Sequence, residues 1–346
     1  MKIAMTHVDL PNEAKGGVAF QAHYLANVLV DRGHDVTMFT FSPWFDECRY
    51  QVHQYSINPK LKKFHAFLLA VNLAKTDFSG FDIIHSHGDN FLLFGQHPQV
   101  RTFHGSAIDE ALAAVTLRFR VYQTIIAGLE KIGAWIADVN VGVSEATRSR
   151  IPEVSQVIPN GVDTVLFSLG QKSDHPSILF VGTTGGRKRG AFLAEIFCQE
   201  IRTKFPNAEL WTVMEKPIEG DGIVNFGKIS QEMLCKLYCQ AWVFCLPSTY
   251  EGFGIPYVEA LASGTPVVAS LNVGAKEILD NGKYGVLAED VQIGNQINLL
   301  LEDENLRKKY TEKGLFRSQD FSWEKVAQKY EFIYTELISK YKKELK

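Results

Sequence analysis

Short apolar runs alternate with amphipathic segments along both halves of the chain. This alternation is typical of strands that are joined through helices in a parallel sheet. In the first half it predicts strands near residues 3–7, 36–39, 83–85, 100–103, 139–143 and 156–158, and helices over 18–32 and 117–137. In the second half it predicts strands near 178–181, 208–213, 243–246, 267–269 and 285–287. The pattern therefore indicates an α/β protein with two parallel sheets.

The length of the chain also favours two domains. Its 346 residues, of which 46% are hydrophobic, exceed what one core usually serves. We expect an N-terminal domain over 1–165 and a C-terminal domain over 166–322, with the polar segment 163–175 as a hinge. From 323 to about 345 the spacing predicts a final helix with one apolar face, formed by Val326, Tyr330, Ile333, Tyr334 and Leu337.

The charge and the cysteine content argue against nucleic-acid binding and against metal binding. The formal net charge is only −3, so no global field favours nucleic acid as a partner. The five cysteines include no CxxC pair; Cys235 and Cys239 share a predicted helix face, where we expect core packing rather than metal binding. No apolar run is long enough for a signal peptide or a membrane span. We therefore expect a cytoplasmic protein with reduced thiols and no metal.

The segment EGFGIPYVE, from Glu251 to Glu259, is the most informative in the chain. It follows a predicted buried strand, forms a turn with Gly252 and Gly254, and begins a helix over 255–262. A helix start offers unpaired N–H groups and a partial positive charge, which suit a diphosphate or a polar sugar. The two carboxylates are too far apart to share one proton, so we expect them to bind different hydroxyls of one ligand.

Two other predicted strand ends carry residues suited to a ligand. Gly16 and Gly17 lie between the first strand and the first helix, where open parallel sheets bind ligands, although a plain flexible turn would look the same. Arg187, Lys188 and Arg189 lie in VGTTGGRKRG, after the strand at 178–181. Cations at this position suit a phosphate group, and an exposed basic helix start is the alternative.

Histidines mark the ends of two more predicted strands. His104, in TFHGS, is followed by Gly105, so its ring or backbone can reach a ligand. His85 and His87 fall on one face of a strand, where we expect a hydrogen-bonded packing role. Asn160 and Gly161, in PNGVD, predict a turn that closes the first domain, and Ser144 predicts a helix N-cap.

These motifs resemble those of the retaining nucleotide-sugar glycosyltransferases of glycosyltransferase family 4, and the resemblance covers nearly the whole chain. It rests on Gly16-Gly17-Val18 with YLANVLVDRGHDVTMFT, DIIHSHG, TFHGS, VGVSEATR, PNGVD, VGTTGGRKRG, EGFGIPYVE and FSWEKVAQKY. The resemblance implies the GT-B fold, in which two Rossmann-like domains face each other across a cleft. It also implies that the segment 323–346 packs back on the N-terminal domain.

The resemblance further implies roles for single residues in moving a sugar from a nucleoside diphosphate to an acceptor hydroxyl, with retention and without a metal or other cofactor. Catalytic roles fall to His104, which orients the sugar, Lys188, which stabilises the leaving diphosphate, and Glu251, which holds the sugar. Donor-binding roles fall to Gly17, Arg187, Lys188, Gly252, Phe253, Gly254 and Glu259. Arg187 would assist Lys188, Glu259 would bind the ribose, and Arg189 would be solvated.

The chain departs from the commonest family pattern at Thr183, where an arginine is usual, and instead matches a VGTxxxRK variant. Covalent attack by Glu251 stays open beside same-face substitution assisted by the leaving phosphate. Two other functions also stay open: a nucleotide-sugar epimerase or hydrolase with the same fold, and a non-catalytic sugar-nucleotide-binding module. Epimerised donor in the absence of acceptor would indicate the first of these.

The sequence says least about the acceptor, for which a glycan, a lipid-linked glycan and a small molecule all stay open. For the donor we expect a nucleotide sugar of the UDP or GDP type. Aromatic residues over 43–63, such as Trp44 and Tyr50, could stack on sugars or cover the core. The run KLKKFHAFLLAVNLAK at 60–75 predicts a basic amphipathic helix. Such a helix could hold the protein peripherally at the inner face of a membrane.

Overall fold

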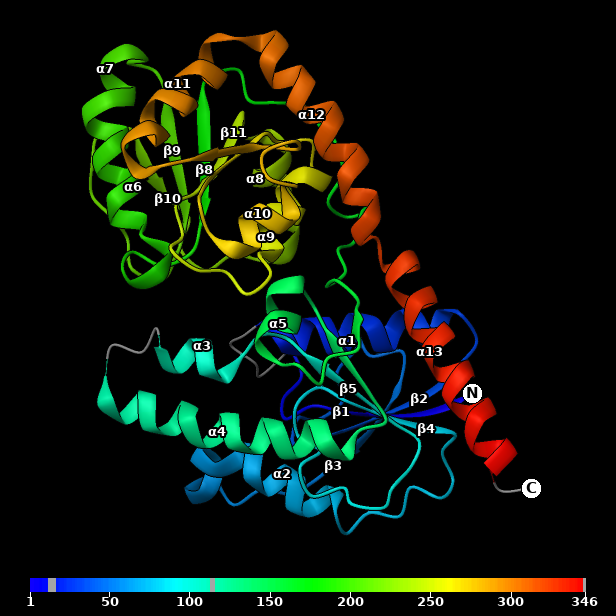
Figure 1. Cartoon of the computed structure of the whole chain (residues 1–346). Coiled ribbons are helices and arrows are strands. Elements are labelled where there is room, and N and C mark those ends of the chain that lie inside the picture. Colours follow the sequence, from blue (N-terminus) through cyan, green and yellow to red (C-terminus); the bar gives the residue numbers. More distant parts are fainter. Residues whose placement is uncertain (12–16, 113–115, 345–346) are drawn as a thin grey trace. The chain divides into compact units, whose positions relative to one another are not determined.

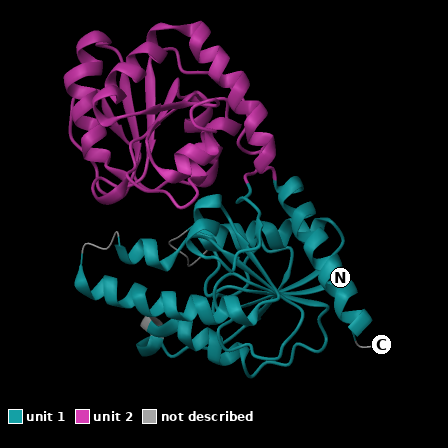
Figure 2. Ribbon diagram, in the orientation of Figure 1, with its two compact units in different colours: residues 1–161, 323–346 teal, residues 162–322 magenta. Residues whose placement is uncertain are grey.

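The computed structural model describes residues 1–11, 17–112 and 116–344. Within these ranges the chain forms two compact units, one of 1–161 with 323–346 and one of 162–322 (Figures 1 and 2). The sequence-based division fell at 165/166, four residues after the observed division at 161/162. The whole of the expected hinge segment, 163–175, therefore belongs to unit 2. Each unit is described by itself below.

The described residues of unit 1 form a parallel sheet of seven strands in the order β3-β2-β1-β4-β5-β6-β7. The strands are β1 (Lys2–Thr6), β2 (Asp35–Thr40), β3 (Gln51–Gln54), β4 (Ile83–Ser86), β5 (Gln99–Phe103), β6 (Val139–Gly142) and β7 (Gln156–Val157). The helices are α1 (Gly17–Asp31), α2 (His65–Leu73), α3 (Ala107–Leu112), α4 (Leu117–Ile136), α5 (Glu145–Arg150) and α13 (Trp323–Glu344). Ser144 caps α5 as predicted, accepting a hydrogen bond from the Thr147 amide at 3.0 Å.

The core of unit 1 joins the two ends of the chain. Trp323, Val326, Tyr330, Tyr334 and other apolar residues of α13 lie in one buried cluster with residues of β1, β2 and α1. The Arg32 guanidinium at the end of α1 binds the Glu331 carboxylate of α13 at 2.7 Å, which adds an ion pair to this packing. The last helix therefore packs into the core of unit 1 together with α1 and the sheet.

The segment 60–75 differs from the single amphipathic helix that we predicted. Pro59–Phe64 is a 3-10 helix (η1), and only His65–Leu73 is α-helical. Leu61 and Phe64 stay exposed. No core contact therefore favours continuing the α-helix through this part, and the side chains of residues 62 and 63 lie outside the described structure.

The described residues of unit 2 form a parallel sheet of six strands in the order β10-β9-β8-β11-β12-β13. The strands are β8 (Ser177–Val181), β9 (Glu209–Val213), β10 (Ile223–Asn225), β11 (Val243–Leu246), β12 (Val267–Ser270) and β13 (Val286–Ala288). The helices are η2 (Gly186–Lys188), α6 (Gly190–Ile196), η3 (Phe197–Ile201), α7 (Arg202–Lys204), α8 (Gln231–Gln240), α9 (Ile255–Ala262), α10 (Val273–Ile278), η4 (Asp290–Gln292), α11 (Ile293–Glu302), α12 (Glu304–Ser318) and η5 (Gln319–Phe321). Because all strands are parallel, their carboxyl ends meet at one edge, where open sheets bind ligands.

Candidate active site

A buried ion pair lies at the carboxyl edge of the unit 2 sheet. The Lys188 Nζ, in the loop after β8, is 2.7 Å from the Glu251 Oε1, in the loop after β11. The Arg187 guanidinium approaches the other carboxylate oxygen at 3.5 Å and donates to the Tyr250 carbonyl at 3.0 Å. Glu251 is only 4% exposed. The structure therefore pairs a residue expected to bind sugar with two expected to bind phosphate.

This pairing affects the protonation of Lys188. Burial lowers the pKa of the Lys188 ammonium below its ordinary value, and the Glu251 carboxylate acts in the opposite direction. A buried charge without a partner is costly, so the carboxylate favours the charged form of the lysine.

Backbone constraints fix the turn that carries Glu251. Gly254 has φ +102°, a left-handed conformation that glycine adopts readily, and a Cβ there would meet the Tyr257 ring at 2.5 Å. Asn272 caps α10, accepting from the Ala275 amide at 2.9 Å, and its side chain donates to the Ser248 carbonyl at 3.0 Å. At Gly274 a Cβ would lie 2.5 Å from the Phe253 carbonyl oxygen, so the start of α10 supports the turn at close range. Asn272 and Gly274 were missed by the sequence analysis.

Two of the expected donor-binding residues in this turn present mainly backbone. The Phe253 side chain is buried and its ring lies 5.9 Å from that of Phe321, so it packs in the core. Gly252 is half-buried between Glu251 and Phe253. Any contact of these residues with a ligand would therefore be made by main-chain atoms.

Glu259 lies in α9, about one turn after the helix begins at Ile255. Burial raises the pKa of its carboxyl group to about 7, although a hydrogen bond from Tyr238 and the charge of Lys188 act to lower it. The influence of Lys188 on both carboxylates means that Glu251 and Glu259 belong to one electrostatic cluster. At neutral pH Glu259 is divided between its acid and its carboxylate form.

The prediction that Arg189 would be solvated is wrong. Its guanidinium binds both carboxylate oxygens of Asp290, at 2.6 and 2.7 Å, and donates to the Pro247 carbonyl at 2.6 Å and the Ser270 hydroxyl at 3.0 Å. Arg189 also has φ 56°, a left-handed conformation that is uncommon outside glycine. It thus ties together the loops after β8, β11 and β12, and its role is structural.

In unit 1, His104 follows β5 and forms a pair with His87, which follows β4. The His87 Nδ1 and His104 Nε2 are 2.9 Å apart and hydrogen-bonded, and the rings stack with centroids 5.2 Å apart. Burial and the neighbouring His7 lower the pKa of His104 to about 3, while the side chain of Asn160 acts to raise it. His104 is therefore neutral at physiological pH.

His85 has the packing role that we predicted. Its Nε2 lies 2.8 Å from the Thr102 hydroxyl, and its Nδ1 lies 2.6 Å from the Tyr334 hydroxyl of α13. Burial lowers its pKa to about 3. His87 is also buried and hydrogen-bonded, with its ring 4.4 Å from that of His85, as predicted, and its hydrogen-bond partner is His104.

Gly17 begins α1 and is exposed, and Gly16 lies outside the described residues. One turn into the helix, the buried Gln21 side chain exchanges two hydrogen bonds with the backbone of Gly161, at 3.1 and 2.9 Å. These bonds tie the helix to the PNGVD turn, whose Asn160 influences His104. The turn that we expected to close the first domain thus also contributes to the surroundings of the histidine.

Among the described residues, no group of three or more histidine, cysteine or acidic side chains could hold a metal ion. All five cysteines are free, and Cys235 is buried in α8. None of the described helices is both long enough and apolar enough to cross a bilayer.

Comparison with known proteins identifies the family. Residues 15–166 match the model of Glycosyltransferase Family 4, and residues 215–315 match that of Glycosyl transferases group 1. The chain belongs to glycosyltransferase family 4. The resemblance seen in the sequence is thereby confirmed, and so is the prediction of an enzyme that transfers sugars.

Relatives of this family 4 glycosyltransferase include two mannosyltransferases. The O-antigen chain mannosyltransferase B of Escherichia coli is 34% identical over 162 residues, which are 42% of each chain. The phosphatidyl-myo-inositol mannosyltransferase of Mycobacterium tuberculosis is 27% identical over 288 residues, with 73% of each chain covered. Among solved structures, a sucrose-phosphate synthase from Thermosynechococcus elongatus superposes with a TM-score of 0.79 at 23% identity, covering 98% of this chain and 99% of that one. This similarity confirms the GT-B fold class.

Proposed function

We propose that this glycosyltransferase moves a sugar from a nucleoside diphosphate sugar of the UDP or GDP type to an acceptor hydroxyl, with retention of the anomeric configuration. The main support is the Lys188–Glu251 pair at the carboxyl edge of the unit 2 sheet. A donor brings a diphosphate, which competes with Glu251 for Lys188 and Arg187, and sugar hydroxyls, which donate hydrogen bonds to a carboxylate. One ligand therefore supplies a new partner to each member of the pair.

In this reaction the bond between the anomeric carbon and the diphosphate oxygen breaks, and a bond to the acceptor oxygen forms on the same face of the sugar. The acceptor hydroxyl loses its proton to the departing diphosphate. Lys188 and Arg187 stabilise the negative charge that develops on the diphosphate, the largest electrostatic contribution that we assign to this chain. Glu259 accepts hydrogen bonds from the ribose, and His104, as a neutral imidazole, orients the sugar.

A donor screen tests this function. Purified protein is incubated with UDP- and GDP-sugars and an acceptor extract, and the nucleoside diphosphate released is measured together with the anomeric configuration of the product by NMR. We expect an α-linked product from an α-linked donor. An inverted product would contradict retention, and an epimerised donor or free sugar formed equally well without acceptor would favour the epimerase or hydrolase alternative.

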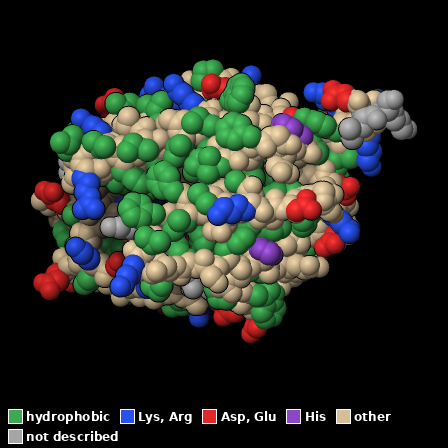
Figure 3. Space-filling model, turned by 90° about the horizontal axis from the view of Figure 1, so that it is seen from below, with side chains coloured by type: hydrophobic (Ala, Val, Ile, Leu, Met, Phe, Trp, Pro, Cys, Tyr) green, Lys and Arg blue, Asp and Glu red, His purple; other side chains and the backbone are tan. Residues whose placement is uncertain are grey.

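We also propose that the acceptor is lipid-linked and that α4 holds the enzyme at an anionic membrane surface. Apolar side chains recur along one exposed face of this helix, with Leu117 77% and Trp135 78% exposed. The face is formed by Leu117, Val121, Ile125, Ile132 and Trp135. Figure 3 shows many apolar side chains gathered on the side of the molecule seen from below, with lysine and arginine side chains around them.

The charges of α4 favour an anionic lipid surface over a second copy of the chain. The helix sequence contains Arg118, Arg120 and Lys131, all exposed, and a single acid, Glu130. Glu130 is turned inward, since its Oε2 accepts a hydrogen bond from the Ala107 amide at 3.1 Å. The exposed charges of the helix are therefore all positive, which attracts anionic lipids and opposes pairing of two identical faces. The sequence analysis proposed this role for the segment 60–75, whose α-helix, α2, is shorter than predicted and covers only His65–Leu73.

Co-sedimentation with vesicles tests the docking surface. The wild-type chain should bind vesicles containing phosphatidylglycerol, weakly or not at all those of phosphatidylcholine alone, and binding should fall in high salt. Ile125→Glu should abolish binding, whereas Phe316→Glu, which changes an even more exposed apolar residue of α12, should not. Binding that survives Ile125→Glu would contradict the proposal, and a dimer dissolved by this substitution would show that the face joins two copies.

A further inference from the structure

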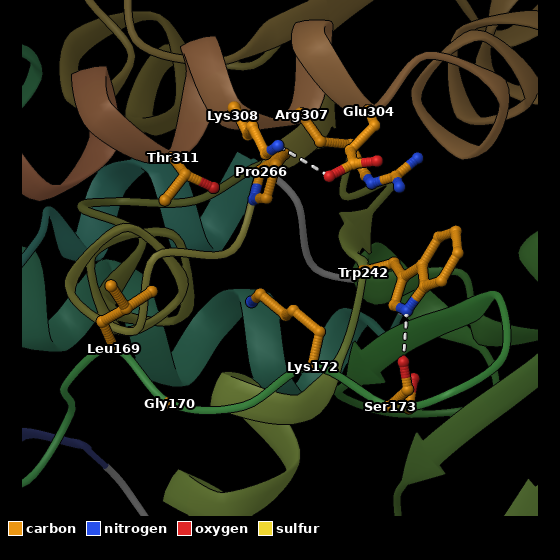
Figure 4. Close-up of a pocket in the computed structure, with 10 residues that line it drawn as sticks. All are labelled: Leu169, Gly170, Lys172, Ser173, Trp242, Pro266, Glu304, Arg307, Lys308 and Thr311. Atoms are coloured by element: carbon orange, nitrogen blue, oxygen red, sulfur yellow. Dashed lines mark hydrogen bonds and ion pairs between the residues drawn. The ribbon is translucent and has the colours of Figure 1, made fainter.

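A cavity lies in unit 2, away from the carboxyl edge of the sheet. It has a volume of about 410 Å³ and is lined by Leu169, Gly170, Lys172, Ser173, Trp242, Pro266, Glu304, Arg307, Lys308 and Thr311 (Figure 4). Trp242 and Pro266 immediately precede β11 and β12. Each of these strands has four residues, so roughly 13 Å of strand separates the cavity from the loops that follow β11 and β12, the first of which carries Glu251. The volume lies in the range of small-molecule sites.

The described lining of this cavity carries more positive than negative charge. Glu304 is its single carboxylate and forms an ion pair with Lys308 at 2.7 Å. Lys172 donates to the Thr265 hydroxyl at 2.7 Å, and Arg307 donates to the carbonyls of Leu300 and Leu301 at 2.7 and 2.9 Å. These acceptors are all uncharged. Lys172 and Arg307 thus form no ion pair with a carboxylate of the described lining, and the charges of Glu304 and Asp303 act on Arg307 only from a longer distance.

The surroundings make this charge unfavourable in the empty cavity. Burial lowers the pKa of Lys172 to about 8, and the nearby charge of Arg307 acts in the same direction. The Lys172 side chain extends into the cavity, as Figure 4 shows. An anion would offset both the lost hydration and the repulsion between the two cations.

The remaining walls are apolar or aromatic. Leu169 comes from the segment that enters unit 2, and the Trp242 indole lies under the Arg307 guanidinium, 4.1 Å from the ring centroid. The Trp242 Nε1 is satisfied by the Ser173 carbonyl at 2.9 Å, which holds the ring in place. Such walls suit a ring or a hydrocarbon portion next to the charged group.

We propose that this cavity binds a small organic phosphate, with its phosphate group at Lys172 and Arg307 and its apolar portion against Leu169 and Trp242. A phosphate monoester carries close to two negative charges at neutral pH, which matches the two cations that form no ion pair with a carboxylate of the described lining. The cavity is built from residues that have no part in the proposed donor site, so the two sites can be tested separately.

Calorimetric titration with phenyl phosphate tests the site. The full-length wild-type chain should bind phenyl phosphate but not phenol, and Lys172→Met should weaken binding about 10-fold or more, because it removes a charge-assisted hydrogen bond. Lys329→Met, which removes a lysine from the lining of another cavity, in unit 1, is the matched control and should bind like the wild type. Equal affinity of Lys172→Met and wild type would overturn the proposal.

Two further measurements distinguish this site from the donor site and from a purely structural role. Saturation with UDP, and in a separate titration with GDP, should leave the affinity for phenyl phosphate unchanged. Displacement of phenyl phosphate by either nucleotide would place the probe in the donor site and overturn the proposal. Lys308 also lines the cavity, but its side chain is exposed, so Lys308→Glu should leave the core unchanged. Because this substitution places a negative charge at the cavity, it should also weaken phosphate binding. It therefore tests the proposal even if Lys172→Met does not fold.

Protonation gives an independent readout. Lys172 faces Cys239 of α8 and Arg307 of α12, with Glu304 and Lys308 on the same cavity wall. Because an anion favours the charged lysine, binding above pH 8 should take up a proton, which is detected as a dependence of the measured heat on the ionisation enthalpy of the buffer. Uptake should vanish in Lys172→Met. Binding without proton uptake by the wild type at pH 8.5 would contradict contact with Lys172.

Discussion

The two units keep buried polar groups in different ways. In unit 2 the buried Glu251 side chain forms an ion pair with Lys188 at 2.7 Å. In unit 1 burial lowers the pKa of His85 and of His104 to about 3, so these two buried rings are neutral. The comparison shows two ways of keeping polar groups in a protein interior, an ion pair in unit 2 and uncharged histidine rings in unit 1.

Lys188→Ala should give the largest effect, because it removes the partner of the buried Glu251 and the main cation for the leaving group. We expect kcat to fall about 100- to 1,000-fold, as when a preorganised group that stabilises transition-state charge is lost. The measurement is nucleoside diphosphate release at saturating donor. Lys188→Arg, which keeps the charge, should recover part of the rate. A kcat equal to that of the wild type would refute the role of unit 2 in charge stabilisation.

His104→Ala should lower kcat less, by about 10- to 100-fold, since a neutral ring contributes positioning rather than charge. Its pKa of about 3 means that the ring does not titrate between pH 5 and 8. The ratio of wild-type to variant kcat should therefore be constant over this range. A ratio that changed with a midpoint near pH 6.5 would show that His104 is charged in the working enzyme.

Glu259→Gln should raise the donor KM about 10-fold with a smaller change in kcat, because it removes a charged acceptor that serves binding. With a pKa of about 7, the carboxylate form increases as pH rises through 7, so wild-type kcat/KM should rise over the same interval. A steady-state pH profile of both proteins measures this. The rise should be absent in the variant, and its persistence would assign the titration to another group.

Arg189→Met should have the smallest effect on catalysis and act on stability. Loss of its bidentate bond to Asp290 should lower the free energy of unfolding of unit 2 by about 1–2 kcal/mol, a modest amount because Asp290 is half exposed. Lys204→Met, which breaks an exposed pair with Glu302, should change it by less than about 1 kcal/mol. Urea denaturation measures the free energy of unfolding of both variants. Equal losses in the two variants would contradict the structural role of Arg189.

Local patterns predicted most of the fold. The helix 255–262 and the strand 243–246 have the predicted bounds, because a buried strand, a glycine turn and an apolar helix follow one another there. The strands β3 and β10 were missed. β3 reads Gln-Val-His-Gln and β10 has only three residues, and both are edge strands whose limited burial leaves little hydrophobic signal in the sequence.

The sequence allowed single site residues to be predicted at the ends of strands, but not the contacts between them. Parallel topology places the residues that follow β8 and β11 at one edge, which is why Lys188 and Glu251 could be singled out. Their direct pairing, across 63 residues of sequence, depends on the lengths and conformations of two loops. The same is true of the bond from Arg189 to Asp290 and of Asn160 beside His104, for which no local pattern exists.

The Lys188–Glu251 pair also bears on the end of the catalytic cycle. Once the sugar has left with the acceptor, Glu251 has lost its hydroxyl partners while the spent nucleotide still occupies Lys188. In the proposed reaction we expect the free carboxylate to compete for the lysine and to repel the remaining phosphates, which would speed product release. Replacing Glu251 by glutamine should accordingly make the by-product a stronger inhibitor, even as it weakens recognition of the sugar.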